Sequence, residues 1–180
     1  MQRRNLRSAL AAYADRYPQE QGTVQRFATL LGDHTNCFER TCWAGHITGS
    51  AWIVDPTRQQ TLLTHHAKLN IWVQTGGHSD GDPDTWAVAQ REGEEESGLR
   101  LTLLDAGIFD LDVHEIPARK ADPAHWHYDV RFAFLADSAA FKVSEESHAL
   151  AWVPIADLGS VTQEESMLRM ARKWQQQAAD

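Results

Sequence analysis

The sequence has little of several features that mark particular classes of protein. Its 180 residues include two cysteines, Cys37 and Cys42, whose spacing fits neither a metal-binding pair nor a disulfide framework. Six prolines and a hydrophobic content of 42% argue against extensive disorder. We therefore expect one folded domain with a short extension, reduced cysteines and a cytoplasmic location.

Long hydrophobic runs and an excess of positive charge are also missing. No apolar run approaches the length of a membrane span, and the N-terminal run, residues 9–14, is too short for a secretory signal. Acidic residues number 25 against 17 basic ones, which gives a formal charge of −8. This balance disfavours a nucleic acid or a membrane as partner. A small phosphorylated substrate that binds together with a metal ion fits better.

A cluster of glutamates is the most informative feature that is present. If residues 86–97 form a helix, Glu92, Glu95 and Glu96 stand at positions i, i+3 and i+4, so their carboxylates share one face. Such a trio suits a hard cation such as Mg²⁺, which takes oxygen ligands and leaves positions for phosphate and water. A solvated acidic helix face is the alternative that these residues alone leave open.

Helix signals surround this cluster. Asp82 is a candidate N-cap, Pro83 fits the first helical position, and Asp84 complements the positive end of the helix dipole. Gly98 is a candidate left-handed terminator. The sequence therefore predicts a helix between the two signals.

The rest of the chain alternates between helical and strand patterns. We expect amphipathic helices over residues 4–16, 19–31 and 163–176, and a turn at Gly76 and Gly77. Strands are expected over residues 46–54, 60–66, 71–74, 101–109, 112–116, 128–135 and 149–154. Pattern alone indicates an α/β or α+β fold.

The stretch from Gly77 to Leu99 resembles the Nudix box. That signature reads Gly, five residues, Glu, seven residues, then Arg-Glu-apolar-any-Glu-Glu-any-Gly-apolar. Without a gap, the chain matches it at Gly77, Arg91, Glu92, Glu95, Glu96, Gly98 and Leu99. Pro83 stands in place of the first Glu, and Gly93 in place of the first apolar residue.

The resemblance implies a fold and a function. The fold is α/β: an α/β/α sandwich with a mixed sheet over residues 45–180, after an N-terminal helical extension over residues 1–44. This extension is expected to pack on the core or to form the interface of a homodimer. The function is a metal-dependent hydrolase that cleaves the pyrophosphate linkage of a nucleoside diphosphate joined to another group. Which nucleotide derivative it cleaves stays open.

The resemblance also implies site residues. Mg²⁺ or Mn²⁺ would be held by Glu92, Glu95 and Glu96, and Arg91 would orient them. Glu146 lies six residues before a tryptophan, as an additional loop glutamate does in many relatives. The catalytic candidates are therefore Glu92, Glu95, Glu146 and Arg91. An ordinary acidic surface loop is the alternative for Glu146.

Histidines provide a second group of candidates. In a strand, His125, His127 and Asp129 share one face with Arg131, a pattern of two histidines and a carboxylate that resembles a metal-binding set by residue type. The alternative is a polar cleft wall, with His127 and Arg131 as substrate contacts, or a solvent-facing strand. His78 follows the glycine pair and is expected to touch the substrate.

Other residues carry weaker signals. Four tryptophans could stack on a base, although packing is the commoner role of buried aromatics. They are Trp43, Trp52, Trp72 and Trp126. Arg119 and Lys120 are candidates for a phosphate contact or an exposed basic loop. His65 and His66 must point to opposite faces of their strand, and a structural role is expected of each.

The two departures from the box motivate a second hypothesis. A Nudix-like module that binds or senses a nucleotide, with weak or no hydrolysis, would tolerate Pro83 and Gly93. Against it, all three presumed metal carboxylates are present.

Overall fold

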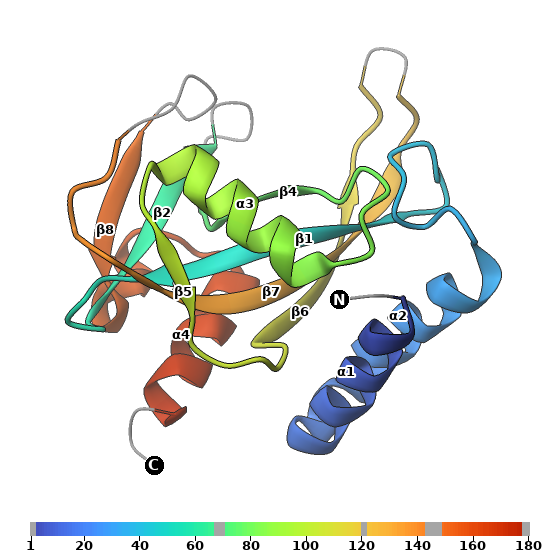
Figure 1. Cartoon of the computed structure of the whole chain (residues 1–180), viewed down its shortest axis with the longest axis horizontal. Helices are drawn as coiled ribbons and strands as arrows, with labels where there is room; N and C mark the ends of the chain where they lie inside the picture. The colour runs from blue at the N-terminus through green and yellow to red at the C-terminus, as the bar shows by residue number, and fades with distance from the viewer. Residues whose placement is uncertain (1–2, 67–70, 120–121, 143–148, 178–180) are drawn as a thin grey trace. The chain divides into compact units, whose positions relative to one another are not determined.

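The computed structural model describes residues 3–66, 71–119, 122–142 and 149–177 (Figure 1). The helices of that part are α1 (Arg3–Arg16), η1 (Pro18–Glu20), α2 (Gln21–Asp33), α3 (Thr85–Ser97), η2 (Ile155–Ser160) and α4 (Glu165–Gln177). No helix within these residues has both the length and the apolar character needed to span a membrane. Both cysteines are buried and unbonded to each other, as expected.

Eight strands form one sheet. They are β1 (His46–Val54), β2 (Gln60–His66), β3 (Ile71–Val73), β4 (Thr75–His78), β5 (Leu101–Leu103), β6 (Asp110–Ile116), β7 (His125–Ala136) and β8 (Leu150–Pro154). The order is β3-β2-β1-β7-β5, with β4 paired to β1, β6 to β7 and β8 to β2. A mixed sheet with flanking helices, preceded by N-terminal helices, confirms the predicted fold class.

The chain divides into two compact units that both draw on β1, α3 and β7. The first consists of residues 1–50, 76–89 and 105–132, and the second of residues 51–75, 90–104 and 133–180. The expected boundary between residues 44 and 45 stays a prediction.

In the first unit, α1 and α2 lie side by side, as Figure 1 shows in blue. Leu6 and Leu10 of α1 and Leu31 of α2 are buried, which confirms the predicted apolar faces. The ring of Phe27 in α2 meets the ring of Tyr128 in β7 edge-on, with centroids 5.2 Å apart. The N-terminal helices therefore pack on the sheet of their own chain.

In the second unit, β2 lies between β3 and β8, which pair with it antiparallel at His65↔Trp72 and Leu62↔Trp152. Helix α4 buries Met167, Met170 and Trp174, the apolar face that the sequence predicts. The Trp174 indole N–H donates to the carbonyl of Arg58 at 3.2 Å, which ties the helix to the turn after β1.

Two predicted elements were wrong in detail. The Gly76–Gly77 pair lies inside strand β4 and not in a turn. The glycine is needed because a Cβ on Gly76 would stand 2.2 Å from the hydroxyl oxygen of Ser50 on β1. The strand expected over residues 101–109 ends at Leu103, since the carboxylate of Asp105 accepts a hydrogen bond from the amide of Gly107 and closes a turn there.

Candidate functional site

Helix α3 carries the acidic cluster, and its ends are set by side-chain and glycine signals. The carbonyl of Asp84 accepts the first helical bond, from the amide of Val88 at 3.0 Å, and its carboxylate accepts from the amide of Ala87 at 3.5 Å. Asp84 is therefore the cap, and Asp82, predicted for that place, supports it by accepting from the Asp84 amide at 2.9 Å. Gly98 ends the helix with φ +67°, as predicted.

Close packing holds both halves of α3. In the first unit, a Cβ on Gly49 of β1 would lie 2.6 Å from the carbonyl oxygen of Thr85. In the second unit, a Cβ on Gly93 would lie 2.7 Å from Leu101 Cδ1 and 3.1 Å from Ala51 Cβ. The glycine that departs from the box pattern is thus required by the short distance between α3 and its neighbouring strands.

A fourth glutamate of α3, Glu94, has a structural role. Glu94 Oε1 accepts hydrogen bonds from the amide of Leu101 at 2.9 Å and from Gln90 Nε2 at 3.3 Å. Gln90 Nε2 also donates to the carbonyl of Leu101 at 3.0 Å. Glu94 and Gln90 therefore attach the helix to β5, and the neighbouring acids point elsewhere around the helix.

The other three glutamates follow the helical repeat along a different face. Glu95 is exposed, while Glu92 and Glu96 are half-buried. Arg91 Nη2 lies 3.1 Å from Glu92 Oε1, a contact that fits the orienting role predicted for Arg91. A set made only of carboxylate oxygens suits Mg²⁺ or Mn²⁺ better than a softer metal.

A histidine cluster, His46, His78, His125 and His127, lies in the first unit. His46 begins β1, His78 ends β4, and the other two lie at the start of β7. The ring centroid of His46 lies 4.7 Å from that of His127, 4.9 Å from that of His125 and 5.1 Å from that of His78. The two histidines predicted as substrate contacts, His78 and His127, are therefore neighbours, with ring centroids 5.0 Å apart.

Three imidazoles of the cluster, those of His46, His78 and His127, have lowered pKa values and are neutral at physiological pH. Burial, followed by repulsion from His78 and His125, lowers the pKa of His46 to about 4. Burial, followed by Arg40, lowers the pKa of His78 to about 4, and burial, followed by His46 and His78, lowers the pKa of His127 to about 2. The Cys42 carbonyl opposes the pKa shift of His46 weakly, although neither His46 nitrogen has a hydrogen-bond partner of acceptable geometry.

The carboxylate of Asp129 faces away from the histidine cluster. Its Oδ1 accepts from Thr48 Oγ1 at 2.8 Å and from Ser50 Oγ at 2.7 Å, and its Oδ2 accepts from Arg131 Nε at 2.7 Å. Donors on β1 and β7 thus engage both oxygens of this carboxylate. The set of two histidines and Asp129 considered from the sequence is not the group of ligands that assembles here; His46 takes the third place.

Arg131 is enclosed by carboxylates. In addition to Asp129, it reaches Asp110 at 3.1 Å and Asp112 at 3.4 Å, and its side chain is 3% exposed. Burial alone would lower its pKa, but the three aspartates together raise the pKa of this guanidinium. These surroundings favour a structural role for Arg131 over the substrate contact that the sequence suggests.

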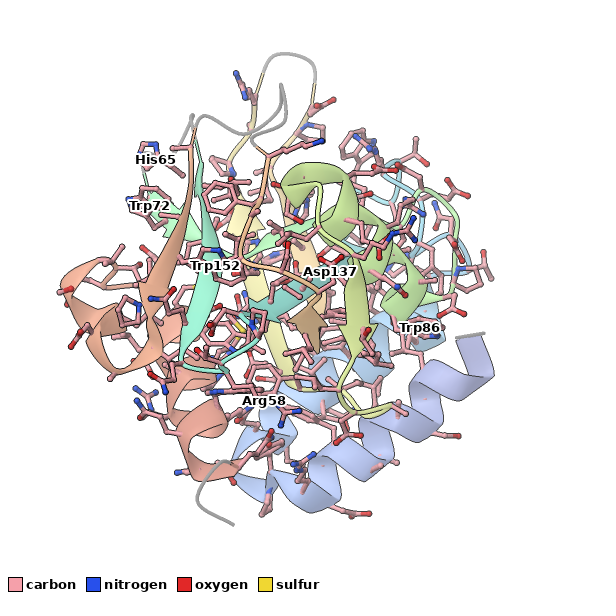
Figure 2. All side chains as sticks on the ribbon, turned by 60° about the vertical axis from the view of Figure 1, so that its left-hand side comes forward. Arg58, His65, Trp72, Trp86, Asp137 and Trp152 are labelled. Carbon is pink, nitrogen blue, oxygen red and sulfur yellow. The ribbon has the colours of Figure 1, made fainter. Side chains whose placement is uncertain are left out.

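The remaining candidates separate by exposure. Trp52 is fully buried, whereas Trp43 and Trp126 are 42% and 37% exposed. The rings of His65 and Trp72, two of the residues labelled in Figure 2, lie beside each other with centroids 5.1 Å apart. Base stacking is therefore closed to Trp52. The exposed Trp126 ring already has the guanidinium of Arg26 over it, with Cζ 4.5 Å from the ring centroid, and the Trp43 ring meets that of His125.

Some predicted residues lie outside the described part of the chain. They are Lys120 and Glu146. The partner of Lys120 in the predicted basic loop, Arg119, forms an isolated bridge with Asp122.

His46 is the residue that sequence reasoning missed. It stands 79 positions before His125 in the chain, and no local spacing connects the two. Only the pairing of strands that are distant in sequence brings their rings together.

Comparison with known proteins identifies the fold and the family. A hydrolase of the NUDIX family from Clostridium perfringens is 22% identical, with a TM-score of 0.55 over 72% of this chain and 96% of that one. An Ap4A hydrolase from C. elegans is 18% identical, with a TM-score of 0.60 over 74% of this chain and 97% of that one. The NUDIX domain of NrtR from Shewanella oneidensis, solved with ADP ribose, is 17% identical, with a TM-score of 0.55 over 84% and 97% of the two chains.

No curated protein matches the sequence. The family model for the NUDIX domain, however, matches residues 46–174, which include the carboxylates of α3 and the histidine cluster. The recognition made from the Gly77–Leu99 motif is thus confirmed over most of the chain. The protein belongs to the NUDIX domain family.

Proposed function

We propose that the protein is a divalent-metal-dependent hydrolase that cleaves the pyrophosphate linkage of a nucleoside diphosphate joined to another group. The observation that supports the proposal is that the glutamates of α3 have two different roles. Glu94 is used to attach the helix to β5, while Glu92, Glu95 and Glu96 keep the i, i+3, i+4 spacing of a cation site. An acidic helix face that is only solvated would not require these separate roles.

The cofactor in this proposal is Mg²⁺ or Mn²⁺, held by Glu92, Glu95 and Glu96. The ion would supply charge neutralisation of the diphosphate and a bound water of lowered pKa. Arg91 orients Glu92 through their 3.1 Å contact. Glu92, Glu95 or the loop residue Glu146 takes the proton from water as it attacks phosphorus, a task that requires hydrogen-bond reach to that water.

A small nucleotide-type substrate fits both the charge of the chain and its relatives. The net charge of −8 disfavours long polyanions, whereas a compact diphosphate can arrive with its metal. One structural relative is named for Ap4A, and another was solved with ADP ribose. We place the enzyme in the cytoplasm, in keeping with its two reduced cysteines.

The test is phosphate release from a panel of nucleotide sugars, ADP-ribose, dinucleoside polyphosphates and nucleoside triphosphates. Each is incubated with Mg²⁺, with Mn²⁺ and with chelator, and a phosphatase is added to reveal monophosphate products. The proposal expects metal-dependent release from one class. If no compound of the panel releases phosphate although circular dichroism shows a folded protein, the proposal is overturned.

A nucleotide-binding module with weak or no hydrolysis is the second candidate, and Pro83 is the observation that favours it. In place of a box glutamate, Pro83 lies outside the helix, between Asp82 and the capping Asp84. Calorimetry separates the two functions. A nucleotide that binds in the presence of Mg²⁺ but gives no product over long incubation supports the module, and Pro83→Glu then asks whether the missing carboxylate limits turnover.

A further inference from the structure

We propose that His46, His125 and His127 form a Zn²⁺ site that uses none of the carboxylates of α3. One ring nitrogen from each histidine lies within 4.8 Å of the other two, from the starts of strands β1 and β7. Tetrahedral zinc, with Zn–N bonds of about 2.0–2.1 Å, needs nitrogens about 3.3 Å apart. The three rings must therefore move closer together when the ion binds.

Buried nitrogens without partners point to a ligand at this place. His46 is 2% exposed, and neither of its ring nitrogens has a hydrogen-bond partner. Nε2 of His127 is likewise buried without a partner. Native proteins rarely leave such buried groups unsatisfied without a reason. A metal ion bound to one nitrogen of each ring would engage the lone pair of that nitrogen.

The hydrogen bond of the third histidine sets which of its ring nitrogens can bind a metal. Nδ1 of His125 lies 2.8 Å from the carbonyl oxygen of Pro123. Because a carbonyl only accepts, Nδ1 carries the proton and Nε2 keeps its lone pair. Zinc-binding histidines commonly donate their other ring N–H to a carbonyl in this way, which fixes the tautomer.

The chemistry of the cluster selects the class of metal. Three imidazoles without a carboxylate suit Zn²⁺, Cu²⁺ or Ni²⁺, whereas Mg²⁺ prefers oxygen. Burial keeps the pKa of His46 at about 4 and that of His127 at about 2, so both rings are in the neutral, metal-binding form near pH 7. Neighbouring neutral rings can share one cation, whereas three charged rings would repel.

A fourth position is available. The ring of His78 lies 5.1 Å from that of His46 and 5.0 Å from that of His127, measured between centroids, so it is the candidate fourth ligand. If His78 stays outside, water completes a three-histidine site. His114 is 5.5 Å from His127, but its Nδ1 contacts Asp112 at 3.0 Å, so we leave it out of the ligand set.

The experiment is a titration of the full-length, tag-free protein with Zn²⁺ alone. Metal is first stripped with chelator, and binding is then followed by competition with a chromophoric chelator in the absence of nucleotide. We expect one ion per chain. His46→Gln and His125→Gln should weaken binding by more than about a hundredfold, beyond the 10–100-fold typical of losing an outer-shell partner.

Matched variants locate the ion. His114→Gln and His65→Gln remove histidines outside the set and should leave the affinity unchanged. A triple Glu92, Glu95 and Glu96→Gln variant should also keep Zn²⁺ binding, which separates this site from the one proposed for catalysis. Zinc binding can therefore hold even if the protein hydrolyses nothing, and hydrolysis can hold without zinc.

A second measurement tests the proposal in case the histidine variants fail to fold. In the unchanged protein, Co²⁺ in place of Zn²⁺ should give the intense visible absorption of tetrahedral nitrogen ligation, and one equivalent of Zn²⁺ should shift the imidazole nitrogen signals in NMR. A stripped protein that binds no ion at one per chain, or binding that survives substitution of all three histidines, would overturn the proposal.

Discussion

A Cβ atom on Gly93 would lie 2.7 Å from Cδ1 of Leu101, so the helix that carries the acidic cluster has no room for a side chain where the Nudix box usually has an apolar one. Ala51 Cβ and Ile53 Cδ1 would also be met, at 3.1 and 3.3 Å. Glycine in a helix interior costs roughly 1 kcal/mol relative to alanine. Here the close packing of α3 on β1 and β5 offsets that cost.

Gly93→Val is therefore expected to destabilise the protein by about 1–3 kcal/mol, the usual cost of overpacking a core. Urea unfolding followed by circular dichroism measures this free energy. Leu101→Ala removes the atom that lies nearest, so the loss in the double variant should be smaller than the sum of the two single losses. As control, Gly22→Ala on α2, where a Cβ would meet nothing within 4 Å, should be neutral or stabilising. A fully stable Gly93→Val protein would contradict the close packing.

Glu96→Gln keeps the size of the side chain and removes its charge. If Glu96 binds the catalytic metal, turnover should fall by at least about a hundredfold, on the scale of a lost acid–base group. Phosphate release from the substrate that the panel identifies, at saturating Mg²⁺, measures this. Glu94→Gln makes the same change on the same helix, but its Oε1 can still accept from the Leu101 amide, so turnover should stay near that of the unchanged protein. Equal turnover in the two variants would remove the metal assignment of Glu96.

Arg131→Met tests the buried network around Asp110, Asp112 and Asp129. Removing the cation that contacts all three leaves uncompensated buried charge, and breaking such pairs typically costs about 3–5 kcal/mol. Arg40→Met is the control, since the Arg40–Asp80 pair is largely exposed and should contribute at most about 1 kcal/mol. Thermal or urea unfolding compares them. A small effect of Arg131→Met on stability, together with a large rise in KM, would restore the substrate-contact role.

The sequence predicted most of this molecule where the signals are local. The i, i+3, i+4 spacing of the three glutamates, the terminator Gly98 and the apolar face of α4 all follow from periodicities within one element, and the structure has them. The Gly76–Gly77 pair was misread because glycine signals both turns and close approach, and Ser50, which decides between them, is far away in the chain.

The histidines show the same limit at the site. Alternation along one strand placed His125, His127 and Asp129 on one face, but it could not show that Thr48 and Ser50 of another strand engage the carboxylate. Nor could it show that His46 stands beside the two histidines. Partners from other strands depend on sheet register, which a single sequence specifies only weakly.

Asp55, in the turn after β1, supplies a prediction about pH. Its carboxylate accepts from the amides of Thr57, Gln59 and Gln60 at 3.1, 2.9 and 2.8 Å. Burial raises the pKa of Asp55, but these bonds and one from the Thr57 hydroxyl outweigh burial and leave the pKa below its ordinary value. A carboxyl that is more acidic when folded stabilises the protein above its unfolded pKa, and this contribution is lost as the pH falls through the folded value.

Asp55→Asn should consequently be less stable than the unchanged protein at pH 7, with a difference that shrinks as the pH falls below about 4. Urea unfolding at a series of pH values measures the two free energies. The charge matters because a carboxylate accepts hydrogen bonds more strongly than the amide oxygen that replaces it. Asp15→Asn, at an exposed position of α1, removes the same charge without such a turn and should show no comparable loss at pH 7. A stability difference for Asp55→Asn that stays constant from neutral to acid pH would mean that the turn depends on the shape of the side chain and not on its ionisation.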